Sequence, residues 1–135
     1  MALQLQFKHI KKMDAYCRTR APEEACGIIA GLDNIVASIH PAENNMHSPV
    51  EYRVNPADQI RIFNEIYGRD LDDIGYFHSH PVSEPFPSLT DIREVHIGPV
   101  RLVILSLRGP NPEVRSFWVD EGKVQEEGIK IVAEE

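Results

Sequence analysis

The sequence predicts an α/β fold in which helices cover both faces of a mixed central sheet. Three observations support this prediction. Apolar residues recur at helical spacing over residues 7–17. The pair Asn55-Pro56 is a strong helix start, with an N-cap residue followed by proline at the first helical position. Residues 102–105 form a continuous apolar run, as expected for a strand that is covered on both faces.

The first third of the chain contributes one helix and two strands. The spacing of Phe7, Ile10, Met13 and Cys17 predicts a helix from about residue 7 to 20 that stops before Pro22. A buried strand follows at residues 24–31, and a short turn leads to a second strand at residues 34–40.

The middle of the chain contributes a short strand and a second helix. A polar loop leads to a strand at residues 52–54. Asn55 then caps a helix that Gly68 terminates. The predicted apolar stripe of this helix consists of Ile60, Phe63, Ile66 and Tyr67.

The last part of the chain begins with an apolar strand at about residues 73–79. The loop at residues 81–87 contains three prolines, and proline fixes φ, so the loop should be stiff. It forms either one lip of a substrate groove, with Phe86 as an apolar contact, or a simple rigid connection. The remaining elements are a helix at about 89–96 and strands near 102–105, 114–119 and 123–132. Of Phe117 and Trp118, which point to opposite sides of a strand, one fills the core.

Length and charge limit the class of protein. A chain of 135 residues is large enough for one core, so we expect one domain over residues 1–135. The net charge of −7 argues against a nucleic-acid partner, which requires a basic surface. The same charge argues against binding to anionic membrane surfaces.

Cysteine usage and the N-terminus indicate a cellular location. Cys17 and Cys26 are too few for a disulfide framework, which favours a reducing cytoplasm. The first eight residues alternate apolar and polar side chains and lack the apolar region of a signal peptide. No apolar run approaches the roughly 20 residues of a membrane span. We therefore expect a cytoplasmic protein.

One short stretch carries the ligands for a metal. The sequence His78-Ser79-His80-Pro81 is followed by Asp91, within fourteen residues. In extended backbone, histidines at i and i+2 point to the same face. Two imidazoles and a carboxylate suit zinc, and three protein ligands leave a coordination position open for water, as in catalytic zinc sites. A water on such a zinc ion has its pKa lowered toward about 7.

Hydrolysis by an activated water also requires a general base. The best candidate is Glu24, at the start of the strand predicted for residues 24–31. Each residue also has a structural interpretation. Ser88 and Asp91 form a capping-box pattern, which can itself begin the helix that presents Asp91. Glu24 alone would most often belong to a solvated pair with Glu23.

The other four histidines are assigned no metal role. His9 is expected on a surface helix, His40 and His47 in or near loops, and His96 on a helix face that Asp91 does not share. Cys26 is either a ligand or redox group or, as free cysteine usually is, a small buried apolar residue.

Taken together, these motifs resemble the signature of the JAMM (MPN+) zinc metallopeptidases. Glu24 stands in E-x-C-G, followed by H-S-H-P and then by S-x-x-D, with seven residues between His80 and Ser88. The resemblance runs from about Phe7 to Trp118 and includes a lead-in of the form S-P-x-x-Y-x-x-x-P that begins at Ser48. The short single-domain form is similar to the prokaryotic CysO-cysteine peptidases, which act on ubiquitin-like sulfur carriers.

The resemblance implies a fold, a set of roles and a substrate. The fold is a three-layer α/β/α domain of the JAMM or cytidine-deaminase type. His78, His80 and Asp91 would bind one Zn²⁺ per chain. Glu24 would deprotonate the attacking water and protonate the leaving amine, and Ser88 would stabilise the oxyanion. The substrate would be a peptide or isopeptide bond at the C-terminal Gly-Gly of a ubiquitin-like sulfur-carrier protein, for example a carrier-cysteine adduct.

Other functions are weighed against this one. Zinc deaminases use H-x-E with a downstream P-C-x-x-C, and this chain has no C-x-x-C, so deamination is excluded. A JAMM peptidase acting on other small or cell-wall peptides is one alternative, and a non-catalytic MPN scaffold is another. A homodimer is expected only from the general frequency of symmetric association.

Overall fold

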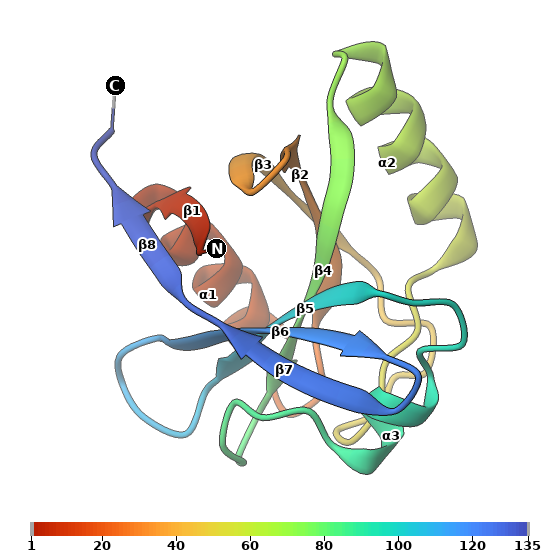
Figure 1. Ribbon diagram of the computed structural model, residues 1–135. Coiled ribbons are helices and arrows are strands. Elements are labelled where there is room, and N and C mark those ends of the chain that lie inside the picture. The colour runs from red at the N-terminus through yellow and green to blue at the C-terminus, as the bar shows by residue number, and fades with distance from the viewer. Residues whose placement is uncertain (1, 135) are drawn as a thin grey trace.

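The computed structural model describes residues 2–134 as one twisted eight-stranded sheet with three helices (Figure 1). The strands are β1 (Leu3–Gln6), β2 (Cys26–Leu32), β3 (Ile35–Ala42), β4 (Asp72–His80), β5 (Val100–Ser106), β6 (Glu113–Asp120), β7 (Lys123–Glu127) and β8 (Ile129–Val132). The helices are α1 (Phe7–Arg20), α2 (Pro56–Gly68) and α3 (Leu89–Arg93).

The sheet is mixed, as predicted. Its strand order is β7-β6-β5-β4-β2-β3-β1-β8. Strand β1 runs parallel to both β3 and β8, and β4 runs parallel to β5. The pairs β2–β3, β2–β4, β5–β6 and β6–β7 are antiparallel. Strand β4 therefore lies in the interior of the sheet, between β2 and β5.

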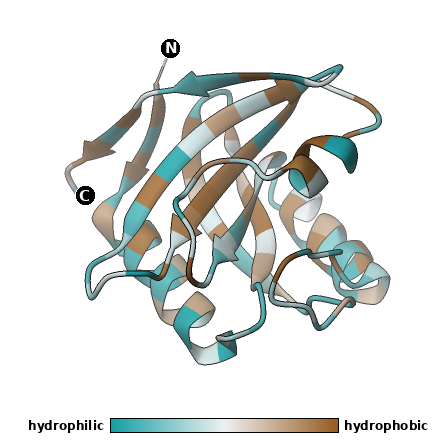
Figure 2. Ribbon diagram, turned by 90° about the horizontal axis from the view of Figure 1, so that it is seen from below, coloured by the Kyte–Doolittle hydropathy of each residue, from teal (hydrophilic) through white to brown (hydrophobic). Residues whose placement is uncertain are grey.

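Helices cover both faces of this sheet, which confirms the predicted layers. Along β2, Ile29 belongs to the apolar cluster beneath α1, whereas Ile28 belongs to the cluster beneath α2. Adjacent residues of a strand point to opposite faces, so α1 and α2 lie on opposite sides. Figure 2 shows hydrophobic residues concentrated along the central strands, which are buried between the helices.

One glycine lets β2 and β4 approach closely. A Cβ atom added at Gly27, the glycine of the E-x-C-G motif, would overlap the ring of Phe77 on β4 and the carbonyl oxygen of His40 on β3. The Phe77 side chain is fully buried in the cluster beneath α1. The glycine of this motif is thus explained by packing between neighbouring strands.

Several element predictions need correction. The N-terminal segment forms strand β1, which was not predicted. Residues 52–54 do not form a strand, because only an isolated bridge joins Asn44 to Val54. The single strand predicted at 123–132 is two strands, β7 and β8, which lie at opposite edges of the sheet. The helix predicted at 89–96 is the shorter α3.

The buried face of α2 also differs from the prediction. Ile62 and Ile66 are fully buried, while Ile60 and Tyr67 are exposed. Residues four apart share a helix face, and Ile62 and Ile66 together pack on the cluster that contains Ile28 of β2. The predicted stripe is therefore wrong at Ile60 and Tyr67, although Asn55 caps the helix as expected by accepting from the backbone N–H of Asp58.

Helix α1 begins and packs in a way that corrects one assignment. Ile10, Met13 and Cys17 are buried, as predicted. His9 was expected on the surface, but it is buried and its Nδ1 accepts a hydrogen bond from the backbone N–H of Gln6 at 3.1 Å. Phe117 is fully buried, so it is the residue of the predicted pair that fills the core. Over residues 2–134, no helix combines the length and apolar character needed to cross a membrane.

Candidate active site

The two histidines of the H-S-H-P motif occupy the C-terminal end of the interior strand β4. In the register of the sheet, His78 lies beside Cys26 of β2 and Ile104 of β5. His78 and His80 point to the same face because they are two residues apart in extended backbone. Both are buried, with His78 fully removed from solvent.

Asp91 reaches the same place from α3, through the capping box that the sequence predicted. Ser88 is the N-cap residue, and its Oγ accepts a hydrogen bond from the backbone N–H of Asp91 at 3.0 Å. In return, the backbone N–H of Ser88 donates to Asp91 Oδ2 at 2.9 Å. The cap therefore begins the helix and also fixes the carboxylate of Asp91 over the end of β4.

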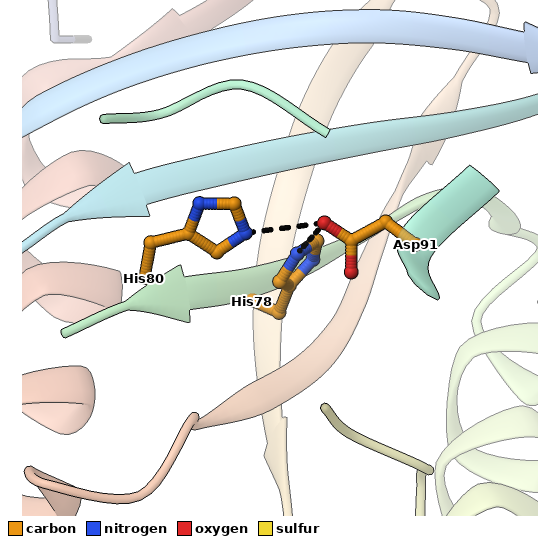
Figure 3. A group of neighbouring side chains, drawn as sticks. All are labelled: His78, His80 and Asp91. Carbon is orange, nitrogen blue, oxygen red and sulfur yellow. Dashed lines mark hydrogen bonds and ion pairs between the residues drawn. The ribbon is translucent and has the colours of Figure 1, made fainter. Parts of the chain in front are cut away.

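The three side chains converge on one point (Figure 3). His78 Nε2 and His80 Nε2 each lie 3.1 Å from Asp91 Oδ2. One ligand atom from each residue lies within 4.8 Å of the other two, and all three residues are buried. Imidazole nitrogen and carboxylate oxygen are ligands that zinc accepts, so the donor set fits a divalent zinc ion.

The proline-rich loop orients one of these ligands. His80 Nδ1 donates to the carbonyl oxygen of Glu84 at 2.8 Å, so in the neutral imidazole Nε2 carries no proton and can bind a metal. Ser106 Oγ of β5 donates to the carbonyl oxygen of Ser83 at 2.7 Å and holds the loop against the sheet. Phe86 packs edge-on against Phe117, with ring centroids 5.3 Å apart.

Tyr52 supports the other histidine. The rings of Tyr52 and His78 are stacked, with centroids 4.4 Å apart and planes inclined by 24°. His78 Nδ1 is buried and has no hydrogen-bond partner among the described residues. The orientation of His78 is fixed by stacking on Tyr52 and by the contact of its Nε2 with Asp91, whereas Nδ1 of His80 is held by its hydrogen bond to the Glu84 carbonyl.

Glu24 lies two residues before β2, which begins at Cys26, although the strand was predicted to begin at Glu24 itself. Its side chain is only 4% exposed, and its buried Oε1 has no hydrogen-bond partner in the described chain. Burial, reinforced by the nearby charge of Asp91 and opposed by His80, raises the pKa of Glu24 to about 8. A carboxyl group with this pKa can both accept and donate a proton near neutral pH. The adjacent Glu23 is exposed and contacts His47.

The site itself has strongly shifted ionisation. Burial lowers the pKa of His78, which favours the neutral form that binds a metal. Burial opposes ionisation of Asp91, but its contacts with His78 and His80 outweigh burial and hold the pKa of Asp91 well below its usual range. The pKa of His80 is raised, since burial is outweighed by its hydrogen bonds to Asp91 and Glu84.

The other histidines and Cys26 stay outside this cluster. His40 is on β3 rather than in a loop and contacts Ser38 Oγ at 2.8 Å. His47 contacts Glu23, and His96 follows α3 in an exposed position. Cys26 is buried, and burial raises the pKa of its thiol to about 12. The thiol therefore remains protonated and behaves as a small apolar group.

One of the hollows along the sheet adjoins the site. A groove of about 410 Å³ is lined by Asp91 and Tyr52 together with apolar side chains that include Val54, Val95 and Leu102. A hollow of about 730 Å³ is lined by residues at the start of β4 and by Arg101 and Trp118. The larger hollow contains none of the three converging residues, which lie at the end of β4.

Several supporting groups were not identified from the sequence. The Glu84 carbonyl is a backbone group, so no side chain signals its role. Tyr52 was noted only as part of the S-P-x-x-Y lead-in, and its stacking on His78 depends on the path of the loop. Asn44 lay in a segment described only as polar, yet its buried side chain donates to the carbonyl oxygen of Glu24. An asparagine inside a polar loop is a weak signal for such a contact.

Comparisons with known proteins identify relatives of this chain. The family described as prokaryotic homologs of the JAB domain matches residues 7–120. The CysO-cysteine peptidase of Mycobacterium tuberculosis strain H37Rv is 30% identical over 126 residues, covering 91% of this chain and 86% of that protein. The desampylase of Pyrococcus furiosus is 31% identical over 112 residues, covering 82% of this chain and 76% of that protein.

Solved structures show the same fold. A protein from Desulfitobacterium hafniense superposes with a TM-score of 0.91 at 29% identity, covering 97% of this chain and 93% of that one. A JAB1/MPN domain protein from Archaeoglobus fulgidus superposes with a TM-score of 0.61 at 14% identity, covering 96% of this chain and 98% of that one.

Proposed function

This chain belongs to the family of prokaryotic homologs of the JAB domain, and from that premise we propose that it is a zinc-dependent metallopeptidase. The observation that carries the proposal is the convergence of His78, His80 and Asp91 on one buried point. The carboxyl group of Glu24 interacts electrostatically with Asp91 and His80, and its buried Oε1 has no hydrogen-bond partner among the described residues. Its relatives are named as a peptidase and a desampylase, which supports a hydrolase.

We assign His78 Nε2, His80 Nε2 and an Asp91 carboxylate oxygen as the ligands of one zinc ion per chain. The donor set and the burial of all three residues support this assignment. When bound, zinc supplies Lewis acidity, which polarises a substrate carbonyl and lowers the pKa of water to about 7. The Glu84 carbonyl and the Tyr52 ring keep the two imidazoles in orientation.

Glu24 is the proposed general base and acid. Its carboxylate would take a proton from the water that attacks the scissile carbonyl carbon. The same carboxyl group would then give that proton to the nitrogen of the leaving amine as the C–N bond breaks. The shielded position and the raised pKa of Glu24 support both transfers, because a group that titrates near the working pH exchanges protons most effectively.

Ser88 is the proposed donor to the developing oxyanion. Its Oγ already accepts from the Asp91 N–H, so the hydroxyl proton is free to point toward the reacting carbonyl. A serine hydroxyl can accept and donate at once. Removing one such donor typically reduces kcat by about 10²–10³-fold.

The proposed substrate is a peptide or isopeptide bond at the C-terminal Gly-Gly of a ubiquitin-like sulfur-carrier protein. The name of the mycobacterial relative, CysO-cysteine peptidase, supports a carrier-cysteine adduct as the specific form. The carrier is the proposed protein partner, and a flexible tail can enter such a site as an added strand. The two cysteines, neither in a disulfide, are compatible with the proposed cytoplasmic location. A homodimer is also proposed, from the general frequency of symmetric association.

The test is intact-mass analysis of a sulfur-carrier protein extended at its Gly-Gly end by one cysteine. Zinc-loaded protein should remove that cysteine, and a chelator should abolish the loss. Glu24→Gln should retain zinc and lose turnover, while the exposed neighbour variant Glu23→Gln should match the wild type. Normal turnover by Glu24→Gln would contradict the mechanism. Bound zinc without cleavage would direct the search to other peptides, and absence of both would favour a non-catalytic scaffold.

A further inference from the structure

Hydrogen bonds hold the backbone of Glu24, whereas Oε1 of its side chain has no hydrogen-bond partner among the described residues. The backbone N–H of Glu24 donates to the carbonyl oxygen of Ser48 at 2.8 Å. The carbonyl oxygen of Glu24 accepts from Asn44 Nδ2 at 2.9 Å. On the other side, Ala25 N–H donates to Ser79 Oγ at 2.9 Å, and Ser79 N–H donates to the Ala25 carbonyl at 3.0 Å. The residue that carries the proposed base is therefore clamped between the loop after β3 and the strand of the metal ligands.

Asn44 is the centre of the contacts on the loop side. Its Nδ2 donates to the carbonyl oxygens of Glu24 and Glu51, at 2.9 and 3.1 Å. Its Oδ1 accepts from the backbone N–H groups of Met46 and Arg53, at 3.0 and 3.1 Å. A carboxamide has two donor hydrogens and two acceptor lone pairs, so every position is used. The residue is only 6% exposed.

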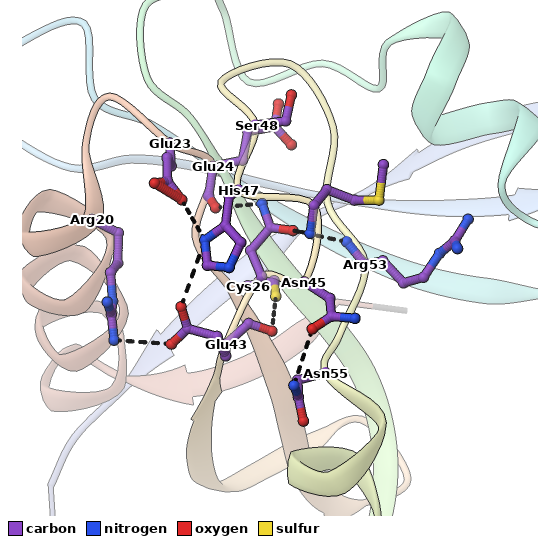
Figure 4. Close-up of polar contacts among 12 residues, drawn as sticks. Arg20, Glu23, Glu24, Cys26, Glu43, Asn45, His47, Ser48, Arg53 and Asn55 are labelled. Atoms are coloured by element: carbon purple, nitrogen blue, oxygen red, sulfur yellow. Dashed lines mark hydrogen bonds and ion pairs between the residues drawn. The ribbon is translucent and has the colours of Figure 1, made fainter.

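The loop closed by these bonds also reaches the metal ligands. Glu51 and Arg53, whose backbones Asn44 holds, flank Tyr52, which stacks on His78. The loop is closed at its base by the hydrogen bond from Asn45 N–H to the Arg53 carbonyl, at 2.8 Å. Figure 4 shows Glu24, Ser48 and Arg53 gathered around this loop. A single buried side chain thus joins the segment of the base to the segment that packs on a ligand.

We propose that Asn44 is a positioning residue of the active site, which holds Glu24 in register with the metal ligands by fixing the loop of residues 44–54 to the Glu24 backbone. This inference rests on the proposed role of Glu24 as general base. Asn44 has no contact with His78, His80 or Asp91 among its hydrogen bonds, so it acts through Glu24 and the loop. A misplacement of about 1 Å in a catalytic group can cost about 10²-fold in rate.

Asn45 provides a matched control. It is the next residue of the same loop and the same amino acid, but its side chain is exposed, and its Oδ1 accepts a hydrogen bond from Nδ2 of the half-buried Asn55 at 3.1 Å. Asn45→Ala therefore removes the same chemical group from the same loop without touching Glu24. Asn44→Asp provides a second variant. It keeps the oxygen that accepts from the N–H groups of Met46 and Arg53, and it removes the NH₂ group that donates to the carbonyl oxygens of Glu24 and Glu51.

The first measurement is amide hydrogen exchange, which needs neither zinc nor substrate. In Asn44→Ala the Glu24 amide should exchange about ten-fold faster or more, because local opening of the loop releases its partner, the Ser48 carbonyl. Amides of the interior strand β5 should be unchanged, and Asn45→Ala should match the wild type throughout. Wild-type protection of the Glu24 amide in Asn44→Ala would overturn the proposal, as would loss of protection in every strand of both Asn44 variants.

The second measurement is turnover of the cysteine-extended carrier at saturating zinc. Asn44→Ala and Asn44→Asp should retain full zinc occupancy and lose about 10²-fold in kcat with little change in KM. Asn45→Ala should keep wild-type kcat. If Glu24→Gln is inactive and both Asn44 variants are fully active, the positioning role of Asn44 is contradicted and the proposed role of Glu24 stands. If Glu24→Gln is itself fully active, the proposed function fails.

Discussion

The Oδ2 atom of Asp91 belongs both to the N-terminal cap of α3 and to the cluster of candidate metal ligands. It accepts the N-terminal hydrogen bond of α3 from Ser88 N–H and lies 3.1 Å from the Nε2 atoms of His78 and His80. The capping box and the ligand assignment are therefore compatible, because the same geometry that starts the helix presents the carboxylate. Ser88 takes part in both, which allows its structural and catalytic contributions to be measured separately.

Two substitutions of Ser88 separate these contributions. Ser88→Ala removes the N-cap and should lower the free energy of unfolding by about 1 kcal/mol, whereas Ser88→Gly should lower it by only a few tenths. Both lack the hydroxyl, so both should lose about 10²–10³-fold in kcat if Ser88 stabilises the oxyanion. Denaturant unfolding and carrier cleavage measure the two effects. Wild-type kcat in Ser88→Gly would limit the role of Ser88 to the cap.

Glu24 should make the metal-free protein less stable as the pH rises. Its pKa is about 8 in the folded protein, against 4.5 ordinarily. The neutral carboxyl contributes its full stability below pH 4.5, and that contribution is lost progressively up to about pH 8, where the folded form also ionises. In chelator, Glu24→Gln should therefore gain about 2 kcal/mol over the wild type between pH 5 and pH 8, less than the ideal value because water can relax the buried charge.

Denaturant unfolding across this pH range measures the effect of Glu24. The exposed neighbour Glu23 serves as the control, because Glu23→Gln should show no such gain. A pH-independent difference between Glu24→Gln and the wild type would contradict burial of an ionisable carboxyl at this position.

The Tyr52 ring should contribute to metal affinity. His78 Nδ1 lacks a hydrogen-bond partner among residues 2–134, so stacking on Tyr52 is a contact outside the ligand cluster that orients this imidazole. Removing a group that orients a ligand typically costs about 10–100-fold in metal affinity. Tyr52→Leu should weaken zinc binding by about ten-fold, measured by competition with a chromophoric chelator. Tyr52→Phe keeps the ring and should bind zinc normally; an equal loss in both variants would assign the effect to the hydroxyl.

At the scale of elements, helix α2 shows what periodicity alone leaves undetermined. Its N-cap followed from Asn55, because capping depends on local chemistry, and the helix ends at Gly68 as predicted, with Arg69 as its C-cap residue. Its buried face did not follow, because isoleucines at positions 60, 62 and 66 allow more than one stripe, and only the cluster beneath the helix selects Ile62 and Ile66. Strand β1 was missed because it is short and leads directly into α1.

Paired substitutions on α2 test this orientation. Ile66→Ala should lower the free energy of unfolding by about 2–5 kcal/mol, because it leaves a cavity against the sheet. Ile60→Ala removes the same atoms from an exposed position of the same helix and should change stability by less than about 0.5 kcal/mol. Similar losses for the two variants in denaturant unfolding would indicate that the helix packs through its other face.

At the scale of the molecule, the site depends on the sheet. His78, His80 and Asp91 lie within fourteen residues, so their pattern was visible in the sequence. Glu24 lies more than fifty residues before them and reaches the site because β2 pairs with β4, with Cys26 opposite His78. That pairing joins strands far apart in the chain, and local sequence patterns do not reveal which strands become neighbours in the sheet. The separation of β7 and β8 to opposite edges of the sheet was unpredictable for the same reason.

The most direct test of the central claim is the zinc content of purified variants after dialysis against metal-free buffer. The wild-type protein should retain one zinc ion per chain, whereas His80→Ala and Asp91→Ala should retain no zinc above the background of the measurement. His96→Ala, which removes an exposed histidine five residues beyond Asp91, should retain one zinc ion. Full zinc content in His80→Ala, or a wild-type protein that binds none, would contradict the assignment of this cluster as the metal centre.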